Sequence, residues 1–188
     1  RPTGRLHMGH YFGTIRERVA LQDMGITTRI IIADYQVITD RDTTEHIQDN
    51  VYNMVVDYLA CGIDPEKTII FTHSAVPALN QLMLPFLSLV TESELLRNPT
   101  VKSEIQMRGF ADEGLPVGFF AYPVSQAADI TAFHANVVPV GEDQLPMLEQ
   151  TKEIVHKFNA VYGETLTDPQ ILLPDNKACL RLPGTDGK

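Results

Sequence analysis

Two histidines that flank a glycine near the start of the chain have the spacing of a phosphate-binding site. His7, Gly9 and His10 follow the turn-forming residues 2–4 and precede apolar residues at a helical period, which predict a helix over about 9–23. The first turn of a helix presents free backbone N–H groups and the positive end of its dipole, and both attract phosphate. Gly9 leaves room for a nucleotide against the backbone, and the two imidazoles share a face from which they can donate hydrogen bonds. Two solvated histidines at a helix start are the alternative interpretation.

A second polar group follows a predicted strand late in the chain. Residues 137–140 predict a strand, and Gly141, Glu142, Asp143 and Gln144 come directly after it, where a long helix begins. The glycine lets a flat ring or a ribose approach the backbone, and a carboxylate accepts hydrogen bonds from ribose hydroxyls. Acidic residues also favour helix N-termini because of the helix dipole, so an ordinary helix start is the alternative.

Asp129 is the third candidate, because it interrupts an apolar helix. Its neighbours there are Val124, Ala127, Ala128, Ile130 and Phe133. A carboxylate buried among such residues needs a partner, which is either a ligand or another protein group in an ion pair or a helix cap.

Strands and helices alternate along the chain and predict how these groups are positioned. Strands are predicted at residues 29–33, 68–72 and 137–140. Helices are predicted at residues 43–62, 76–91, 101–110, 123–134 and 144–162, with Pro123 in the first turn of its helix. This order predicts an α/β fold, a doubly wound parallel sheet of Rossmann type, with a helical insertion at roughly 76–120. In such sheets ligands bind beyond the carboxyl ends of the strands, where the candidate segments would meet.

Composition and charge narrow the class of function. The 188 residues suffice for one domain, 44% of them are hydrophobic, and the net charge is −9. A protein that grips DNA or RNA over a broad surface needs clustered Lys and Arg, so such a role, and DNA as a partner, are not expected. The sequence contains no membrane-spanning run and no signal peptide, which makes the cytoplasm the expected compartment.

No metal site is predicted. Cys61 and Cys179 are far apart and lack a C-x-x-C spacing, and Cys61 is interpreted as a small buried hydrophobe near a helix end. The remaining histidines have no metal-ligand spacing and are interpreted as structural or exposed: His46, His73, His134 and His156.

Several motifs together resemble one enzyme family. They are Pro-Thr-Gly at 2–4, His-Met-Gly-His at 7–10, Ala-Asp-Tyr-Gln at 33–36, Ala-Cys-Gly-Ile-Asp-Pro at 60–65, Tyr-Pro-Val-Ser-Gln-Ala-Ala-Asp-Ile at 122–130 and Val-Pro-Val-Gly-Glu-Asp-Gln at 138–144. In this order and over essentially the whole chain, they resemble class I aminoacyl-tRNA synthetases of the tryptophanyl and tyrosyl branch, and within it the tryptophanyl-tRNA synthetases. A tyrosyl-tRNA synthetase, another H-x-G-H nucleotidylyltransferase and a catalytically inactive synthetase-like protein are the alternatives.

The resemblance implies an activity and its partners. The expected function is ATP-dependent activation of L-tryptophan to tryptophanyl-adenylate and transfer to tRNA(Trp), with Mg²⁺ held through the ATP phosphates and a homodimer as the assembly. The net negative charge is compatible with this, because a synthetase touches tRNA through local patches. Residues 1–188 would form a catalytic domain truncated at both ends. A first strand would precede it, and the K-M-S-K-S loop and the anticodon-recognition domain would follow it.

The resemblance also assigns roles to individual residues. Catalytic roles fall on His7, His10 and Lys102. ATP contacts fall on Arg1, Pro2, Thr3, Gly9, His10, Gly141, Glu142, Asp143 and Leu180. Tryptophan contacts fall on Asp129, which would accept the indole N–H, and on Tyr122, Gln126, Gln36, Val140 and Gln144. Gln36 stands where a histidine is common in the family, and Gln126 where many bacterial members have methionine.

Overall fold

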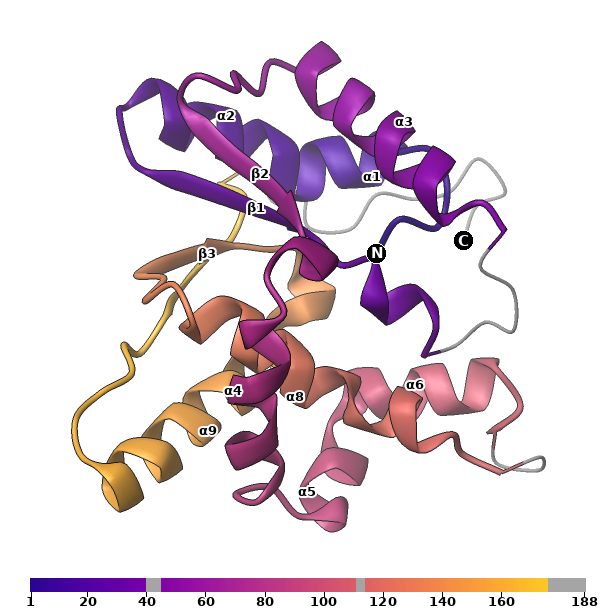
Figure 1. Ribbon diagram of the computed structural model, residues 1–188, viewed down its shortest axis with the longest axis vertical. Helices are drawn as coiled ribbons and strands as arrows, with labels where there is room; N and C mark the ends of the chain where they lie inside the picture. Colours follow the sequence, from indigo (N-terminus) through magenta and orange to yellow (C-terminus); the bar gives the residue numbers. More distant parts are fainter. Residues whose placement is uncertain (40–44, 111–113, 176–188) are drawn as a thin grey trace.

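Two pairs of parallel strands, each accompanied by helices, make up the described part of the chain (Figure 1). The computed structural model describes residues 1–39, 45–110 and 114–175. The elements are, in chain order, α1 (Met8–His10), a π-helical turn (Tyr11–Ile15), α2 (Arg16–Asp23), β1 (Thr28–Ile32), a 3₁₀ turn (Tyr35–Val37), α3 (Ile47–Ala60), β2 (Thr68–Thr72), a 3₁₀ turn (His73–Ala75), α4 (Ala78–Leu87), α5 (Glu92–Arg97), α6 (Pro99–Met107), α8 (Val117–Thr131), β3 (Val137–Pro139), a 3₁₀ turn (Glu142–Gln144), α9 (Leu145–Tyr162) and β4 (Gln170–Leu172).

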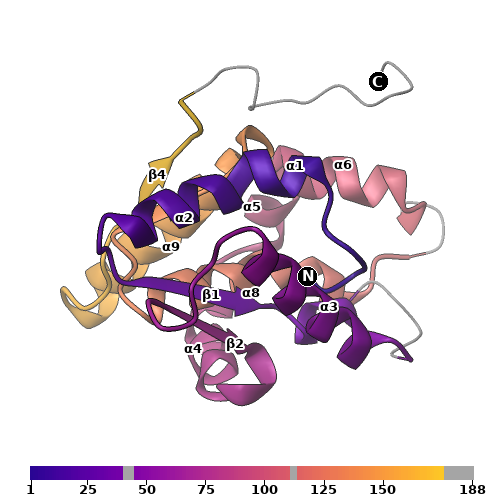
Figure 2. The same cartoon turned by 90° about the horizontal axis from the view of Figure 1, so that it is seen from above.

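The first strand pair holds the helix that follows the two histidines. β1 and β2 pair in parallel along their full length, and α3 is the crossover that such a pair requires. Ile30 and Ile32 lie on one face of β1 and pack against Ile15 and against Met54 and Tyr58 of α3. Seen from above, α1 and α2 run along one side of this strand pair (Figure 2). Burial of these apolar side chains therefore fixes the helix start relative to β1.

A buried glutamine ties α2 to the beginning of β2. Gln22 is 3% exposed, and its Oε1 accepts hydrogen bonds from the Asp64 backbone N–H at 2.7 Å and from the Thr68 hydroxyl at 2.8 Å. Its Nε2 donates to the Gly62 carbonyl at 3.2 Å. Both ends of the amide are satisfied, as a buried polar side chain requires.

The second half is built around three helices and the short pair β3–β4. Phe86 of α4, Val124 of α8 and Ile154 of α9 form one buried cluster. A second cluster joins α6, α8 and α9 to β3 and β4, with Phe119 and Leu148 fully buried in it. α8 is thus covered on both sides, which explains why it is apolar over most of its length.

Asn98 connects α6 to α9. Its Oδ1 caps α6 by accepting from the backbone N–H groups of Thr100 at 3.0 Å and Val101 at 3.4 Å. Its Nδ2 donates to Gln150 Oε1 at 2.8 Å and to the Pro146 carbonyl at 3.2 Å. One buried side chain therefore sets where α6 starts and how α6 lies against α9.

The α/β class with parallel strands is confirmed, and most predicted elements are present. α1, the π-helical turn and α2 together form the helix predicted from residue 9, and β1, β2 and β3 lie within one residue of the predicted strands. Within the described ranges the strands form two separate pairs, β1–β2 and β3–β4, and no ladder joins β1 to β3. In the described part of the region 76–120 the regular elements are the helices α4, α5, α6 and the start of α8, with short turns between them. The predicted cap at Thr43 and Thr44 lies outside the described residues.

Some element boundaries were predicted wrongly. α8 begins at Val117 and not at Pro123, which lies buried inside the helix, because the burial of Phe119 and Tyr122 extends the helix past the missing proline N–H. The helix predicted at 76–91 ends at Leu87. α5 and β4 were not predicted. Among the described residues, no helix combines the length and apolar character needed to cross a membrane.

Candidate functional site

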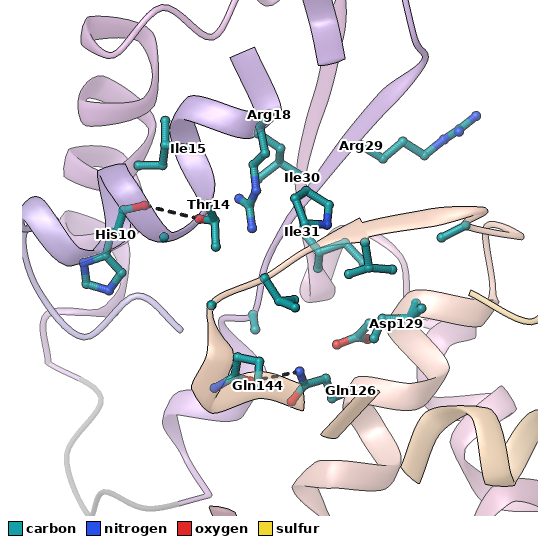
Figure 3. Close-up of a pocket in the computed structure, with 18 of the residues that line it drawn as sticks. His10, Thr14, Ile15, Arg18, Arg29, Ile30, Ile31, Gln126, Asp129 and Gln144 are labelled. Atoms are coloured by element: carbon teal, nitrogen blue, oxygen red, sulfur yellow. Dashed lines mark hydrogen bonds between the residues drawn. The ribbon is translucent and has the colours of Figure 1, made fainter. Parts of the chain in front are cut away.

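A pocket of about 1090 Å³ lies between the two strand pairs. Its walls include residues 28–31 of β1, residues 137–141 at the end of β3, and the start of the first helix. Of the residues assigned by sequence, those that line it are Arg1, His7, Gly9, His10, Gln36, Tyr122, Gln126, Asp129, Val140, Gly141, Asp143 and Gln144. His10, Thr14 and Arg18 lie on one side, and Gln126, Asp129 and Gln144 lie on the other (Figure 3). Segments far apart in sequence thus share one cavity.

The two histidines lock each other and the helix start in place. His7 is the N-cap of α1, and its Nδ1 accepts the Gly9 backbone N–H at 3.1 Å. His10 Nδ1 accepts the His7 backbone N–H at 3.2 Å, which completes a reciprocal capping box. The ring centroids are 3.9 Å apart. The loop before them is held from α3, because Asp57 Oδ2 accepts the Leu6 N–H at 3.1 Å.

These hydrogen bonds determine which nitrogen of each neutral ring carries its proton. Nδ1 is an acceptor in both rings, so the proton of each neutral imidazole is on Nε2. Partial desolvation of the His10 ring is the largest cause of a lowered His10 pKa and the neighbouring His7 is the second, and the shift favours the neutral form. Both Nε2–H groups are then donors for an oxyanion at this helix start.

Gly9 is required by the His7 ring. A Cβ at position 9 would lie 2.9 Å from Cε1 and 3.0 Å from Nδ1 of His7. Carbon contacts that short force the ring to move. Gly9, expected to leave room for a nucleotide, therefore also leaves room for the ring of the catalytic candidate His7.

The opposite wall carries a chain of polar side chains. Gln126 Nε2 donates to Gln144 Oε1 at 3.4 Å, and Gln144 Nε2 donates to Asp143 Oδ2 at 2.8 Å. The Thr100 hydroxyl at the start of α6 donates to the Asp143 carbonyl at 3.0 Å. A Cβ at Gly141 would lie 2.7 Å from Asp143 Oδ1, so the glycine leaves room for this carboxylate. Asp143 is exposed, and its carboxylate can accept a hydrogen bond from a ribose hydroxyl.

Asp129 is the buried carboxylate of the pocket. Its Oδ2 contacts His73 Nε2 at 2.8 Å and receives a long hydrogen bond from Gln36 Nε2 at 3.5 Å. Its Oδ1 is buried and has no hydrogen-bond partner among the described residues. Burial raises the pKa of Asp129, and the His73 hydrogen bond opposes that shift. A buried acceptor without a partner is costly unless a ligand supplies a donor.

Tyr122 and Arg1 close the pocket near α6. The Arg1 guanidinium lies 4.8 Å from the centre of the Tyr122 ring and 3.6 Å from Glu104. Burial is the largest cause of a raised pKa of Tyr122, and the negative charge of Glu104 is the second. The Tyr122 hydroxyl therefore stays protonated. Val140 is 7% exposed and gives this region an apolar surface.

Other assigned residues lie away from the pocket. Lys102 is exposed on α6, whereas Thr100 and Glu104, on another face of the same helix, line the cavity. Pro2 is buried, Thr3 and Glu142 are exposed, and none of them is among the lining residues. Leu180, like Cys179, lies outside the described residues. Cys61 is half-buried at the end of α3.

Sequence reasoning missed Arg18 and His73. Arg18 lines the pocket eight positions after His10, on the face shared with Thr14, so the helical period could have indicated it. His73 directly follows β2, at the end of the strand where ligand groups collect. The other histidines interpreted as structural or exposed include His46 and His156, which are 76% and 71% exposed, and His134, which lines the pocket. The described residues form no group of three or more His, Cys, Asp and Glu side chains suited to a metal ion.

Comparison with known proteins gives one consistent family. The model of the tRNA synthetases class I (W and Y) matches residues 1–188. A curated tryptophan–tRNA ligase of Clostridium longisporum is 53% identical over 191 residues, which cover 100% of this chain and 55% of that protein. The chain thus spans about half the length of the curated relatives it matches.

Solved structures share the fold. Tryptophanyl-tRNA synthetase from Campylobacter jejuni, complexed with ADP and tryptophan, has a TM-score of 0.83 and 32% identity, over 99% of this chain and 56% of that one. The enzyme from Mycoplasma pneumoniae has a TM-score of 0.85 and 26% identity, over 96% of this chain and 51% of its own. A likeness of this extent confirms the Rossmann-like α/β architecture. The match of the family model along the whole chain shows that it belongs to the class I tRNA synthetases of the tryptophanyl and tyrosyl family.

Proposed function

We propose that the intact protein containing this chain activates L-tryptophan with ATP and transfers it to tRNA(Trp). One observation carries the proposal: Asp129 lines the pocket that also holds His7 and His10, and its buried Oδ1 has no hydrogen-bond partner among the described residues. An indole N–H is a donor only and a carboxylate is an acceptor only, so the two are complementary. A side chain without a donor at that depth would leave the acceptor unpaired and would bind more weakly.

The phosphate end of the pocket suits adenylate formation. In the proposed reaction a carboxylate oxygen of tryptophan bonds to the α-phosphorus of ATP while the bond to pyrophosphate breaks. The Nε2–H groups of His7 and His10, the start of α1 and the Arg18 guanidinium stabilise the charge that builds on the phosphoryl oxygens. A ribose hydroxyl of the tRNA then attacks the activated carbonyl carbon, and AMP leaves. The chain contributes position and charge, and no covalent enzyme intermediate is needed.

The remaining partners follow from this activity. Mg²⁺ would be held through the ATP phosphates, with Asp143 and Gly141 facing the nucleoside side. The resemblance adds a homodimer and, because tRNA charging serves translation, the cytoplasm. Lys102, Pro2, Thr3 and Glu142 lie outside the pocket lining and carry no part of the proposal.

Pyrophosphate exchange with single amino acids tests the proposal. The intact protein should exchange labelled pyrophosphate into ATP with L-tryptophan and not appreciably with L-tyrosine. Equal exchange with tyrosine would move the protein to the tyrosyl alternative. No exchange with any amino acid would favour an inactive synthetase-like protein or a nucleotidylyltransferase that uses a different acceptor.

Asp129→Asn should reduce tryptophan selectivity by roughly 10- to 150-fold, the range for losing a hydrogen bond to a charged group. His73 donates to one polar atom of the side chain, so the amide keeps its oxygen there and turns its NH₂ toward the indole N–H. kcat/KM for tryptophan and melting temperature should be measured together. A strongly destabilised variant that still prefers tryptophan as before would make Asp129 a structural residue only.

A further inference from the structure

We propose that His73 is a positioning residue for the amino-acid substrate: its hydrogen bond to Asp129 Oδ2 fixes the orientation of the carboxylate that meets the indole N–H. The inference rests on the proposed function, and it adds a specificity determinant from an element that the sequence analysis left out of the site. It begins from the contact between His73 Nε2 and Asp129 Oδ2 at 2.8 Å, with the imidazole only 4% exposed.

The contact divides the two carboxylate oxygens into different roles. A carboxylate accepts hydrogen bonds at both oxygens and rotates about its last torsion when neither is fixed. Here Oδ2 is occupied by His73, and Gln36 at 3.5 Å is at the weak limit of a hydrogen bond. Oδ1 is buried with no partner among the described residues. In Figure 3 the Asp129 side chain extends from α8 into the pocket, so the orientation that His73 gives the carboxylate affects how it meets a donor that enters there.

His73 is itself held firmly. It begins the 3₁₀ turn directly after β2, and the next residue, Ser74, donates its backbone N–H to Asp34 Oδ1 at 3.2 Å. Asp34 follows β1, so the ends of two paired strands fix the backbone beside the imidazole. The Tyr35 ring lies 6.2 Å from the imidazole, centre to centre. A ring with two torsions on such a support constrains its partner better than a flexible side chain.

The hydrogen bond also fixes the tautomer. When Asp129 is ionised its Oδ2 only accepts, so Nε2 carries the proton of this hydrogen bond. The donor function, not the imidazole as such, is therefore what Asp129 needs. A glutamine at position 73 can place an amide N–H near the Nε2 position, an asparagine is one methylene too short, and a leucine offers no donor.

Steady-state kinetics on His73 variants of the intact protein test the inference. His73→Leu should raise the KM for tryptophan roughly 10-fold, the lower range for a hydrogen bond to a charged group, and leave the KM for ATP unchanged. It should also lower, by a similar factor, the preference for tryptophan over an analogue with sulfur in place of the indole N–H. His73→Gln should restore most of the wild-type KM for tryptophan and most of the preference for tryptophan over the analogue. His156→Leu, at a histidine 71% exposed and remote from the pocket, is the matched control.

Each outcome decides the matter. If His73 is purely structural, His73→Leu should lower the melting temperature and should lower kcat/KM equally for tryptophan and for the sulfur analogue. An unchanged ratio of the two kcat/KM values would overturn the inference. If His73→Leu does not fold, His73→Asn takes its place, and wild-type discrimination by that variant would overturn the inference equally. A wild-type protein without tryptophan-dependent exchange would instead refute the proposed function. If the wild-type protein shows tryptophan-dependent exchange but substitutions of His73 change neither the KM for tryptophan nor the preference for it, only the role of His73 is refuted.

Discussion

At the scale of single residues, His7 and His10 combine two tasks that are often separate. Each uses Nδ1 to accept a backbone N–H of the helix start, which leaves Nε2–H as the outward donor. The capping bonds therefore choose both the tautomer and the direction of the catalytic candidates. This arrangement needs no other side chain to orient the rings, and it makes the site sensitive to any change in the backbone between them.

Gly9→Ala should slow adenylate formation by more than its effect on stability explains. The new Cβ would lie 2.9 Å from the His7 ring, so the ring must turn and its cap on the Gly9 N–H is lost. Loss of a cap costs about 1 kcal/mol of stability, whereas misplacing a donor to the transition state costs on the order of 100-fold in rate. The measurements are the pyrophosphate exchange rate and the melting temperature.

Gly13→Ala provides the stability control for that substitution. Nothing lies within 4 Å of a Cβ built at Gly13, in the π-helical turn that continues α1, so alanine there should not lower the melting temperature. If Gly9→Ala exchanges pyrophosphate at the wild-type rate, the His7 position seen here has no bearing on catalysis.

At the scale of elements, the N-cap of α6 determines one wall of the pocket. Asn98 fixes the start of α6, from which Thr100 donates to the Asp143 carbonyl and Glu104 faces the cavity. The same side chain donates to Gln150 of α9. The position of α6 relative to the turn that carries Asp143 thus depends on a single buried amide.

Asn98→Ala should cost clearly more stability than an ordinary cap deletion. It removes the cap, worth about 1 kcal/mol, and also leaves the buried Gln150 acceptor unpaired, which costs a further 1–3 kcal/mol or so. Thr91→Ala is the matched control, because Thr91 caps α5 at an exposed position. Urea unfolding of both variants gives the comparison. Equal losses would mean that the bond from Asn98 to Gln150 contributes nothing.

Local sequence patterns predicted an element correctly where burial of one apolar face determines its conformation. The apolar runs at β1 and β2 and the helical period after His10 gave those elements, because both follow from burial of one face. Pro123 misplaced the start of α8, because tertiary packing of Phe119 and Tyr122 outweighs a local rule. β4 is a three-residue strand that pairs with β3 and packs Ile171 against the cluster of α8 and α9, contacts that no local pattern contains.

The candidate site shows the same division. Asp129 could be found from sequence because a carboxylate in an apolar helix is anomalous by itself. His73 could not be matched to it, because 56 residues separate the two and they meet through the packing of α4, which follows His73, against α8. The position of His73 just after a strand indicates the end of the sheet where it lies, but it does not indicate which residue it contacts.

At the scale of the whole molecule, the pocket belongs to both halves. The first half supplies the helix start and β1, and the second supplies Asp129 and the turn after β3. What keeps the second half together therefore matters for the site. α5 is linked to α9 by Lys157, which contacts Glu94 at 2.5 Å and also donates to the Leu89 carbonyl at 3.1 Å.

Glu94 should make the stability of this half depend on acid pH. The pKa of Glu94 is lowered from 4.5 to about 2, mainly by its hydrogen bond with Lys157 and secondly by the hydrogen bond from the Thr91 backbone N–H. A carboxyl whose folded pKa is depressed contributes its stability fully above the unfolded value and loses it as the pH falls from 4.5 toward 2. Because the Lys157 side chain is 38% exposed, solvent screening limits this contribution to about 1 kcal/mol.

Glu94→Gln should therefore lower the melting temperature at neutral pH and make progressively less difference below pH 4.5, where the wild-type carboxyl begins to protonate. Thermal melts of wild type and variant at a series of pH values give the difference directly. Glu92→Gln is the control, since Glu92 lies in the first turn of the same helix, is exposed, and has no ion pair among the described residues. A difference between wild type and Glu94→Gln that stays constant from neutral to acid pH would show that the link to Lys157 acts through packing and hydrogen-bond shape, and not through the charge of the carboxylate.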